Sequence, residues 1–375
     1  MSAVEYRFLE PLDVLFLRGN KLFGDPGSFG ESLIPPWPSV AAGAIRSRML
    51  ADDRVDLSDF AAGKVEHPAL GRPERPGSFA INAFYLAKRN QNQAIEILVA
   101  PPADLVISKT KNGALGINRL RPTTLDTALA SSSALPLLPV LAQSERSKAA
   151  SGYWLRQTGW QKYLNGETPA ASDLQSSGEL WTIDSRIGIG LDSGTRSVAE
   201  GKLFSSQAVA LCRDVGFVVG IIGAQPPRDG LLRLGGDGRA AAIRDASISL
   251  PEPDYDAIGK AGRCRLVLTT PGLFPQGWKP PGTTEDNWIA LGGIRARLAC
   301  AAVPRAEVIS GWDLANRQPK PAQRVAPTGS VYWLDQLEGS PEALRKLVKT
   351  GLWGETCEDQ ARRAEGFNQC TVAVY

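Results

Sequence analysis

The stretch EYRFLEPLDVLFLRG at residues 5–19 has a counterpart late in the chain, CRLVLTTPGLFPQGW at residues 264–278. In both, large side chains follow one another along a strand-like run that a proline breaks, and a glycine-containing loop follows. Each stretch is the first strand of a set of patterns in the order strand–helix–strand–strand–helix–strand. This repetition predicts an α+β protein of two ferredoxin-like (RRM-like) domains with long loop insertions.

The first predicted domain covers residues 1–255 and shows clear local patterns outside one insertion. A helix is predicted over residues 40–50, with Ser39 as its N-cap. Its central Gly43 costs about 1 kcal/mol relative to alanine, which suggests a close approach of backbone or ligand. Strands are predicted at residues 5–10, 78–87 and 94–100, and strand hairpins at residues 207–224 and 231–245.

The insertion covers residues 101–165. Its first part, residues 101–150, shows no periodic element and is predicted to be a long loop. Residues 152–164 predict a helix whose aromatic side chains face either the core or stacked bases. Residues 105–165 carry eight basic and two acidic side chains, a net charge of +6, against +3 for the whole chain. Such a basic segment is typical of a phosphate-backbone contact, or of a solvated loop.

The second predicted domain covers residues 256–375. Ser340 is predicted to cap a short helix with Pro341 at its first position. The expected strands of this domain are the run that begins at Cys264 and residues 294–303, 306–314, 330–337 and 369–375.

The composition is that of a globular protein, with 43% hydrophobic residues among 375. No apolar run approaches the length that crosses a bilayer, and the N-terminus lacks the apolar segment of a secretion signal, so a cytoplasmic protein without a membrane partner is expected. The five cysteines are scattered and include no CxxC pair, which predicts free thiols rather than disulfides or zinc ligands.

Residues suited to catalysis are sparse. His67 is the only histidine, which argues against a His-dependent metal site or a pair of histidines for acid–base chemistry. The common nucleophile, phosphate-loop and metalloprotease motifs are absent. The acids Asp13, Asp192, Asp237 and Asp313 lie in separate glycine- or proline-flanked loops, where they are expected to form turns or to pair with arginines. We therefore expect no catalytic residue, no metal and no cofactor.

Seven loop motifs give the sequence a family resemblance. They are PLDVLFLRGNKLFG (11–24), PPWPSVAAGAIRSRM (35–49), GIGLDSGTRSVAEGKLF (188–204), LGGDGRAA (234–241), TPGLFPQGW (270–278), GWDLANRQPKP (311–321) and PTGSVYW (327–333). In this order they resemble the Cas5-like RAMP subunit of type III-B (Cmr) CRISPR effector complexes. Two positions depart from the family pattern, because Asn368 replaces a typical glycine and Asp237 replaces the commoner glutamate.

The resemblance implies a non-catalytic subunit in antiviral defence. It would hold the repeat-derived 5′ handle of the guide RNA (crRNA) and contact the large polymerase-like subunit and the first RAMP backbone subunit. Residues 186–204 suit such a contact, since their glycines permit close approach and their basic side chains can meet phosphates. The candidate RNA-binding residues are Arg18, Lys21, Ser39, Arg46, Lys109, Lys111, Arg119, Arg186, Arg196, Lys202 and Arg239.

Three alternatives stay open at this point. Residues 186–204 could form a purely structural hairpin in which Asp192 and Glu200 pair with the arginines. The chain could be a metal-independent endoribonuclease that processes guide precursors, using Tyr or Lys in place of histidine. It could also be a protein scaffold without RNA contact, with Trp37, Trp278, Trp312 and Trp353 at partner interfaces.

Overall fold

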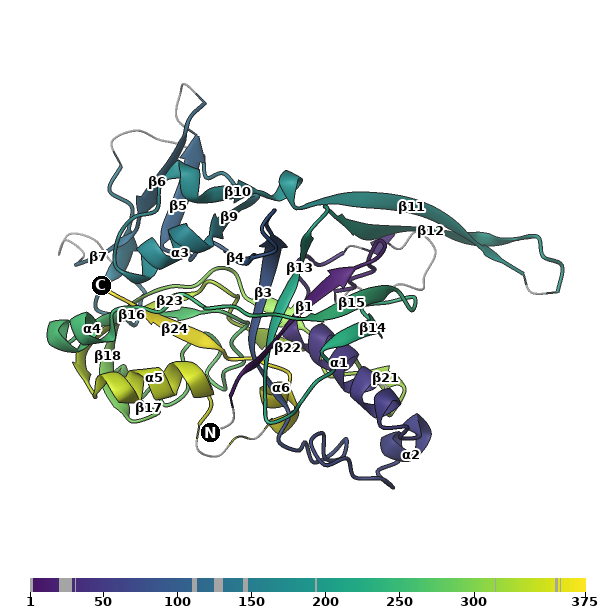
Figure 1. Ribbon diagram of the computed structural model, residues 1–375. Helices are drawn as coiled ribbons and strands as arrows, with labels where there is room; N and C mark the ends of the chain where they lie inside the picture. The colour runs from purple at the N-terminus through teal and green to yellow at the C-terminus, as the bar shows by residue number, and fades with distance from the viewer. Residues whose placement is uncertain are drawn as a thin grey trace.

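The computed structural model describes residues 3–19, 29–30, 32–109, 113–124, 131–143, 148–192, 194–313, 315–354, 357 and 359–375. It shows a mixed α/β protein, mostly strands, with few helices and several antiparallel sheets (Figure 1). Within the described ranges, no helix is both long and apolar enough to span a bilayer.

An eight-stranded sheet forms the N-terminal half, in the order β10-β9-β4-β3-β13-β1-β15-β14. β13 lies near its centre because its sequence, VGFVVGII, is apolar on both faces. The bounds are β1 (Glu5–Pro11), β3 (Ala80–Arg89), β4 (Ile95–Val99), β9 (Tyr153–Arg156), β10 (Leu174–Ser176), β13 (Val215–Ile222), β14 (Asp229–Arg233) and β15 (Ala240–Asp245). The predicted strands at 5–10, 78–87 and 94–100 and the hairpin at 231–245 are confirmed.

Helix α1 (Pro38–Asp52) packs on this sheet through Ala41, Ile45 and Met49. The prediction that Ser39 is its N-cap is wrong. The helix begins two residues earlier, with Trp37 as N-cap and Pro38 in its first turn, where proline needs no hydrogen-bond acceptor. The short helix α2 (Leu57–Ala61) follows, capped by the Asp56 carboxylate.

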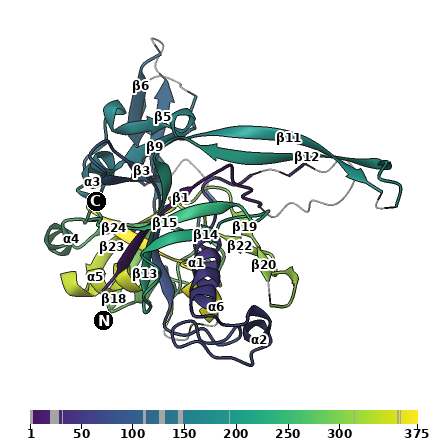
Figure 2. The same ribbon diagram turned by 45° about the vertical axis from the view of Figure 1, so that its right-hand side comes forward.

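Two long strands form an arm that projects from the body (Figures 1 and 2). β11 (Trp181–Leu191) and β12 (Val198–Leu211) pair antiparallel, and the short β2 (Phe29–Gly30) adds to β12 in parallel. The predicted hairpin at residues 207–224 is therefore wrong. β12 pairs with β11, whereas β13 pairs with β1 and β3, so the short turn between β12 and β13 joins two sheets.

The C-terminal half is built on a five-stranded antiparallel sheet in the order β17-β18-β23-β16-β24. Its strands are β16 (Cys264–Leu268), β17 (Trp288–Leu291), β18 (Ile294–Ala302), β23 (Val331–Glu338) and β24 (Cys370–Ala373). Helices α4 (Tyr255–Ala261) and α5 (Pro341–Thr350) cover one face, and α6 (Gln360–Ala364) precedes β24. Ser340 caps α5 as predicted, since its hydroxyl accepts the N–H of Ala343. Two small ribbons, β19 (Glu307–Ile309) with β22 (Gln323–Val325) and β20 (Trp312–Asp313) with β21 (Gln318–Pro319), lie between β18 and β23 in sequence.

The insertion covers the other face of that sheet. Leu105, Trp160 and Tyr163 pack against Val267 and Trp333 in one buried cluster. The predicted long loop at 101–150 is wrong for the described residues, which include the strands β5 (Leu105–Lys109), β6 (Leu115–Arg119), β7 (Arg121–Thr123) and β8 (Leu138–Val140). The predicted helix at 152–164 is half right. Residues Tyr153–Arg156 pair with β4 and β10, and only α3 (Gln157–Leu164) is helical, followed by the short 3-10 turns Ala171–Asp173 and Ser177–Glu179.

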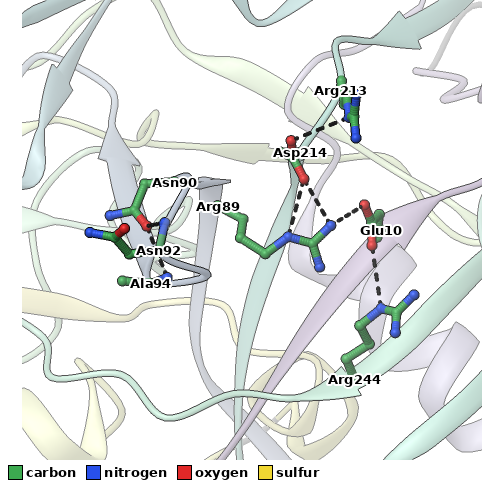
Figure 3. Close-up of polar contacts among 8 residues, drawn as sticks. All are labelled: Glu10, Arg89, Asn90, Asn92, Ala94, Arg213, Asp214 and Arg244. Carbon is green, nitrogen blue, oxygen red and sulfur yellow. Dashed lines mark hydrogen bonds and ion pairs between the residues drawn. The ribbon is translucent and has the colours of Figure 1, made fainter.

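An ion-pair network fixes neighbouring strands of the N-terminal sheet (Figure 3). Arg89 of β3 donates to Glu10 of β1 at 2.7 Å and to Asp214, next to β13, at 2.9 Å. The second oxygen of Glu10 accepts Arg244 of β15 at 3.4 Å. Figure 3 shows the guanidinium of Arg89 between the two carboxylates, so four adjacent strands share one set of charges.

Candidate nucleic-acid interface

Three segments that are distant in sequence meet at the base of the arm. They are the loop after β1 around Phe16, the start of the arm at Asp184 and Arg186, and the turn between β14 and β15. Backbone hydrogen bonds hold them together, because Leu15 and Val209 exchange two bonds of 2.8 Å and Gly236 donates to the Phe16 carbonyl at 2.8 Å. We call this region the arginine cluster, defined by Asp13, Phe16, Arg18, Asp184, Arg186, Asp237 and Arg239.

Two of the predicted RNA-binding residues, Arg186 and Arg239, contact the same aromatic ring. Their Cζ atoms lie 5.6 and 5.3 Å from the centroid of Phe16. Arg186 also pairs with Asp184 at 2.8 Å, and Arg239 donates to Asp13. Each guanidinium is thus partly neutralised, while the side chains of Arg186 and Arg239 stay 41% and 28% exposed.

A third predicted residue, Arg18, lies in the same region. Its Nη2 is 3.8 Å from Oδ1 of Asp237, and both side chains are about half exposed. Asp237 adopts a left-handed φ of 57°, which aspartate tolerates better than most residues. The prediction that Asp13 and Asp237 pair with arginines is confirmed, and the structure brings three of the candidate arginines together.

The arm carries two further candidates, Lys202 on β12 and Arg196 in its turn, both exposed. Asp192 shapes that turn by accepting the backbone N–H groups of Gly194 and Thr195 and the hydroxyl of Thr195. These hydrogen bonds, chiefly those from Thr195, lower the pKa of Asp192. The alternative of a structural hairpin in which Asp192 and Glu200 pair with the arginines is supported only for the hairpin, since β11 and β12 pair but Arg186 pairs with Asp184. Ser193 and the side chain of Glu200 lie outside the described residues.

The arm also has an apolar face that the sequence analysis missed. Ile187 is 80% exposed, and five further large apolar side chains of the arm are exposed: Ile183, Ile189, Leu191, Val198 and Leu203. Ile189 lies directly opposite Leu203, and Leu191 opposite Val198. The signal was present in the alternation of IDSRIGIGL at residues 183–191, which is typical of a strand with one apolar face.

The candidates of the insertion lie apart from the arginine cluster. Arg119 donates to the carbonyls of Gly166, at 2.7 Å, and Glu167, and it lies 5.3 Å from the ring of Tyr163. Burial, followed by the neighbouring Arg265, lowers its pKa. Its contacts connect β6 to the end of α3. Lys109 is exposed at the end of β5, whereas Lys111 and Lys21 lie outside the described residues.

Helix α1 positions the remaining two candidates. Arg46 is half-buried, with Cζ 5.1 Å from the ring centroid of Phe79, and burial lowers its pKa. Ser39 is half-buried in the first turn of the helix.

The only histidine is a structural one. His67 is 4% exposed, and its Nδ1 accepts the N–H groups of Ala69 and Leu70 at 3.1 Å. Nε2 therefore carries the proton and donates to Asp53 at 2.7 Å. Among the residues whose placement is described, no group of three or more His, Cys, Asp or Glu side chains is gathered as metal ligands would be.

Comparison with known proteins gives a family and distant structural likenesses. The family model described as CRISPR-associated protein (Cas_Cmr3) matches residues 7–374. A chain from a structure of the type III-B Cmr-beta complex bound to cognate target RNA and AMPPnP is 14% identical, covers 98% of both chains and has a TM-score of 0.49. A chain from the same complex bound to cognate target RNA is 16% identical, with a TM-score of 0.44 over 88% of this chain and 86% of that one.

A search of curated proteins found no match. The family model, in contrast, extends over nearly the whole chain and includes the arginine cluster, the arm and both large sheets. The resemblance drawn from the seven motifs is confirmed, and the protein belongs to the CRISPR-associated Cas_Cmr3 family.

Proposed function

We propose that this protein is a non-catalytic subunit of a type III-B CRISPR ribonucleoprotein, in which the arginine cluster binds the repeat-derived 5′ handle of the guide RNA. The observation that carries the proposal is the convergence of Arg18, Arg186 and Arg239 from three separate segments at the base of the arm. Family membership supports the same conclusion.

The cluster has the chemistry that a single RNA strand needs. Guanidinium forks bind phosphate oxygens through paired hydrogen bonds and remain charged at any physiological pH. The carboxylates of Asp13, Asp184 and Asp237 balance them, so the free cluster is close to neutral. Phosphates can then replace carboxylates at exposed guanidinium edges. Lys202 and Arg196 extend basic character along the arm.

The second part of the proposal is a bridge between the large polymerase-like subunit and the backbone subunits. We assign the contact with the first backbone subunit to the apolar face of the arm. Contiguous exposed apolar side chains on a projecting element are typical of protein interfaces. Of the four tryptophans considered for partner contacts, Trp312 and Trp278 are exposed, whereas Trp37 is buried and Trp353 half-buried.

We infer that both large sheets are reduced ferredoxin-like units. Counting β1, β3, β13 and β15 as strands one to four, their order across the sheet is 2-3-1-4 with all neighbours antiparallel, and β16, β18, β23 and β24 repeat it. A ferredoxin-like unit has two helices, and in the described residues each unit here keeps one of them. In the first unit it is α1, between β1 and β3, and in the second it is α5, between β23 and β24. The predicted boundary between residues 255 and 256 falls within α4.

A non-catalytic role is supported by the surroundings of His67. Its Nδ1 already accepts two backbone hydrogen bonds and its Nε2 is committed to Asp53, so it is poorly placed to take a proton from an RNA 2′-hydroxyl.

The test uses the complex of the protein subunits, assembled without guide RNA, and an RNA that carries the 5′ handle. We expect the double variant Arg186→Gln/Arg239→Gln to weaken binding and to reduce the log–log salt slope by about 1.4, because each lost phosphate contact on a single strand is worth about 0.7. The matched control is Arg213→Gln/Arg324→Gln, which removes two exposed arginines elsewhere. Equal behaviour of the two double variants would contradict the proposal.

A further inference from the structure

The guanidinium groups of Arg186 and Arg239 both lie over the ring of Phe16. Phe16 is 7% exposed, and the centroid of its ring is 5.6 and 5.3 Å from the two Cζ atoms. A guanidinium over an aromatic face is attracted by the negative charge of that face, and more strongly where water is excluded. One buried side chain therefore contacts a cation of the arm and a cation of the turn between β14 and β15.

The position of Phe16 is itself fixed by its backbone. Its carbonyl accepts the N–H of Gly236 at 2.8 Å, and the neighbouring Leu15 is hydrogen-bonded in both directions to Val209 of β12. A Cβ atom at Gly235 would come within 2.8 Å of the Phe16 carbonyl oxygen, so glycine is needed for this approach. The ring is thus a rigid reference point for long side chains that are otherwise flexible.

We propose that Phe16 is a positioning residue, which holds the guanidinium groups of Arg186 and Arg239 at one spacing for RNA phosphates. The inference rests on the proposed RNA-binding function. The salt bridges do not fix this spacing, because among the residues that the structure describes Asp184 pairs only with Arg186 and Asp13 only with Arg239. Each of these carboxylates is also about half exposed. The shared ring connects the two arginines.

The first test needs no RNA. Phenylglyoxal modifies accessible guanidinium groups, and mass spectrometry of the full chain gives a rate for each arginine. We expect Phe16→Leu to raise the rates of Arg186 and Arg239 several-fold and to leave that of Arg213, which is already exposed, unchanged. The matched control is Phe8→Leu, since Phe8 is also buried and has Arg89 at 5.8 Å, but Arg89 is held by Glu10 and Asp214.

Phe8→Leu should leave all four arginines at their wild-type rates. The inference is overturned if Phe16→Leu leaves the modification rates of Arg186 and Arg239 unchanged. It is also overturned if the control Phe8→Leu raises those rates equally, because Phe16 then does not position the two arginines.

The second test measures binding of the handle RNA, over a range of salt, to the complex of protein subunits assembled without guide RNA. Phe16→Leu should reduce the salt slope by about as much as Arg186→Gln/Arg239→Gln, about 1.4, and should add nothing in that background. A normal slope for Phe16→Leu beside a reduced slope for the double variant would refute positioning for RNA. If instead the double variant binds RNA normally while Phe16→Leu raises the modification rates of both arginines, the proposed function fails and the positioning role remains.

Discussion

Nη1 of Arg265 lies 2.8 Å from Oδ2 of Asp104, and both side chains are almost fully buried. Arg265 belongs to β16 of the C-terminal sheet and Asp104 to the insertion. Tyr163 donates to the other oxygen of Asp104 at 2.8 Å, and Arg265 also donates to the carbonyls of Tyr163 and Val374. The pair therefore fastens the insertion to the C-terminal half through a network with its donors and acceptors satisfied.

Asp104→Asn should lower the free energy of unfolding by about 3–5 kcal/mol, because it leaves the Arg265 charge buried without its counterion. Urea denaturation of the full chain measures the loss. The control is Asp59→Asn, which removes an exposed partner of Lys64 at 3.0 Å and should cost at most about 1 kcal/mol. Similar losses of stability for the two variants would mean that burial does not make the Asp104–Arg265 pair more costly to break than an exposed pair.

Asp13→Asn and Asp184→Asn should each strengthen binding of the handle RNA, by about two- to five-fold, because each removes a carboxylate that competes with phosphate for an arginine of the cluster. Titration of the protein subunits, assembled without guide RNA, with labelled handle RNA measures the change. Asp286→Asn makes the same change of net charge at an exposed site in the other half of the chain. A gain no larger than that of this control would show that only net charge matters.

Ile187→Asp in the arm should reduce incorporation of the chain into the complex without lowering its thermal stability. Ile187 is 80% exposed, so the folded chain loses little packing, whereas a buried interface would have to desolvate the new carboxylate. Co-purification with the backbone subunits measures incorporation. The control is Leu231→Asp at the edge of the N-terminal sheet, where the leucine is 56% exposed. Normal incorporation of the Ile187 variant would remove the arm face from the interface.

Alkaline conditions should destabilise the protein partly through Cys264. Burial raises the pKa of this thiol to about 12, whereas an unfolded thiol ionises near about 8.5. Above the unfolded value the unfolded chain loses a proton that the native chain keeps, so stability falls as pH rises, by up to about 1.4 kcal/mol per pH unit for this group. In Cys264→Ala, the free energy of unfolding should therefore decline less steeply between about pH 8.5 and 10, by up to about 1.4 kcal/mol per pH unit. Urea midpoints across this range test it, and an unchanged slope would contradict it.

Sequence rules that depend only on neighbouring residues predicted the helices and strands that such neighbours determine. Ser340 and Pro341 begin α5, and the runs of large side chains in β1 and β16 mark strands, because capping and strand propensity depend on near neighbours. Strand partners were not predictable in this way. β12 and β13 are apolar runs joined by a short turn, yet they pair in different sheets, which depends on contacts far apart in sequence.

The candidate site shows the same division. The sequence indicated Arg18, Arg186 and Arg239 as basic residues of glycine-rich loops, but their convergence depends on the pairing of Leu15 with Val209. Phe16 was missed because a phenylalanine in an apolar run reads as an ordinary core residue. Arg119 was chosen for its charge alone, and its carbonyl partners after α3 become visible only in the folded chain.

Gly43 and Gly188 should respond to alanine in opposite ways. Gly43 is exposed in the middle of α1, and a Cβ there would meet no atom of this chain within 4 Å, so nothing in the described fold requires the glycine. Gly43→Ala should therefore raise stability by about 1 kcal/mol through helix propensity. At Gly188 of the arm, a Cβ would lie 2.4 Å from the ring of Phe204, so Gly188→Ala must displace that ring and destabilise the arm. Thermal unfolding measures the first change and proteolysis of the arm the second. If Gly43→Ala stabilises the free chain but weakens its assembly or RNA binding, a partner approaches the helix at this glycine; a loss of stability in the free chain would contradict the prediction.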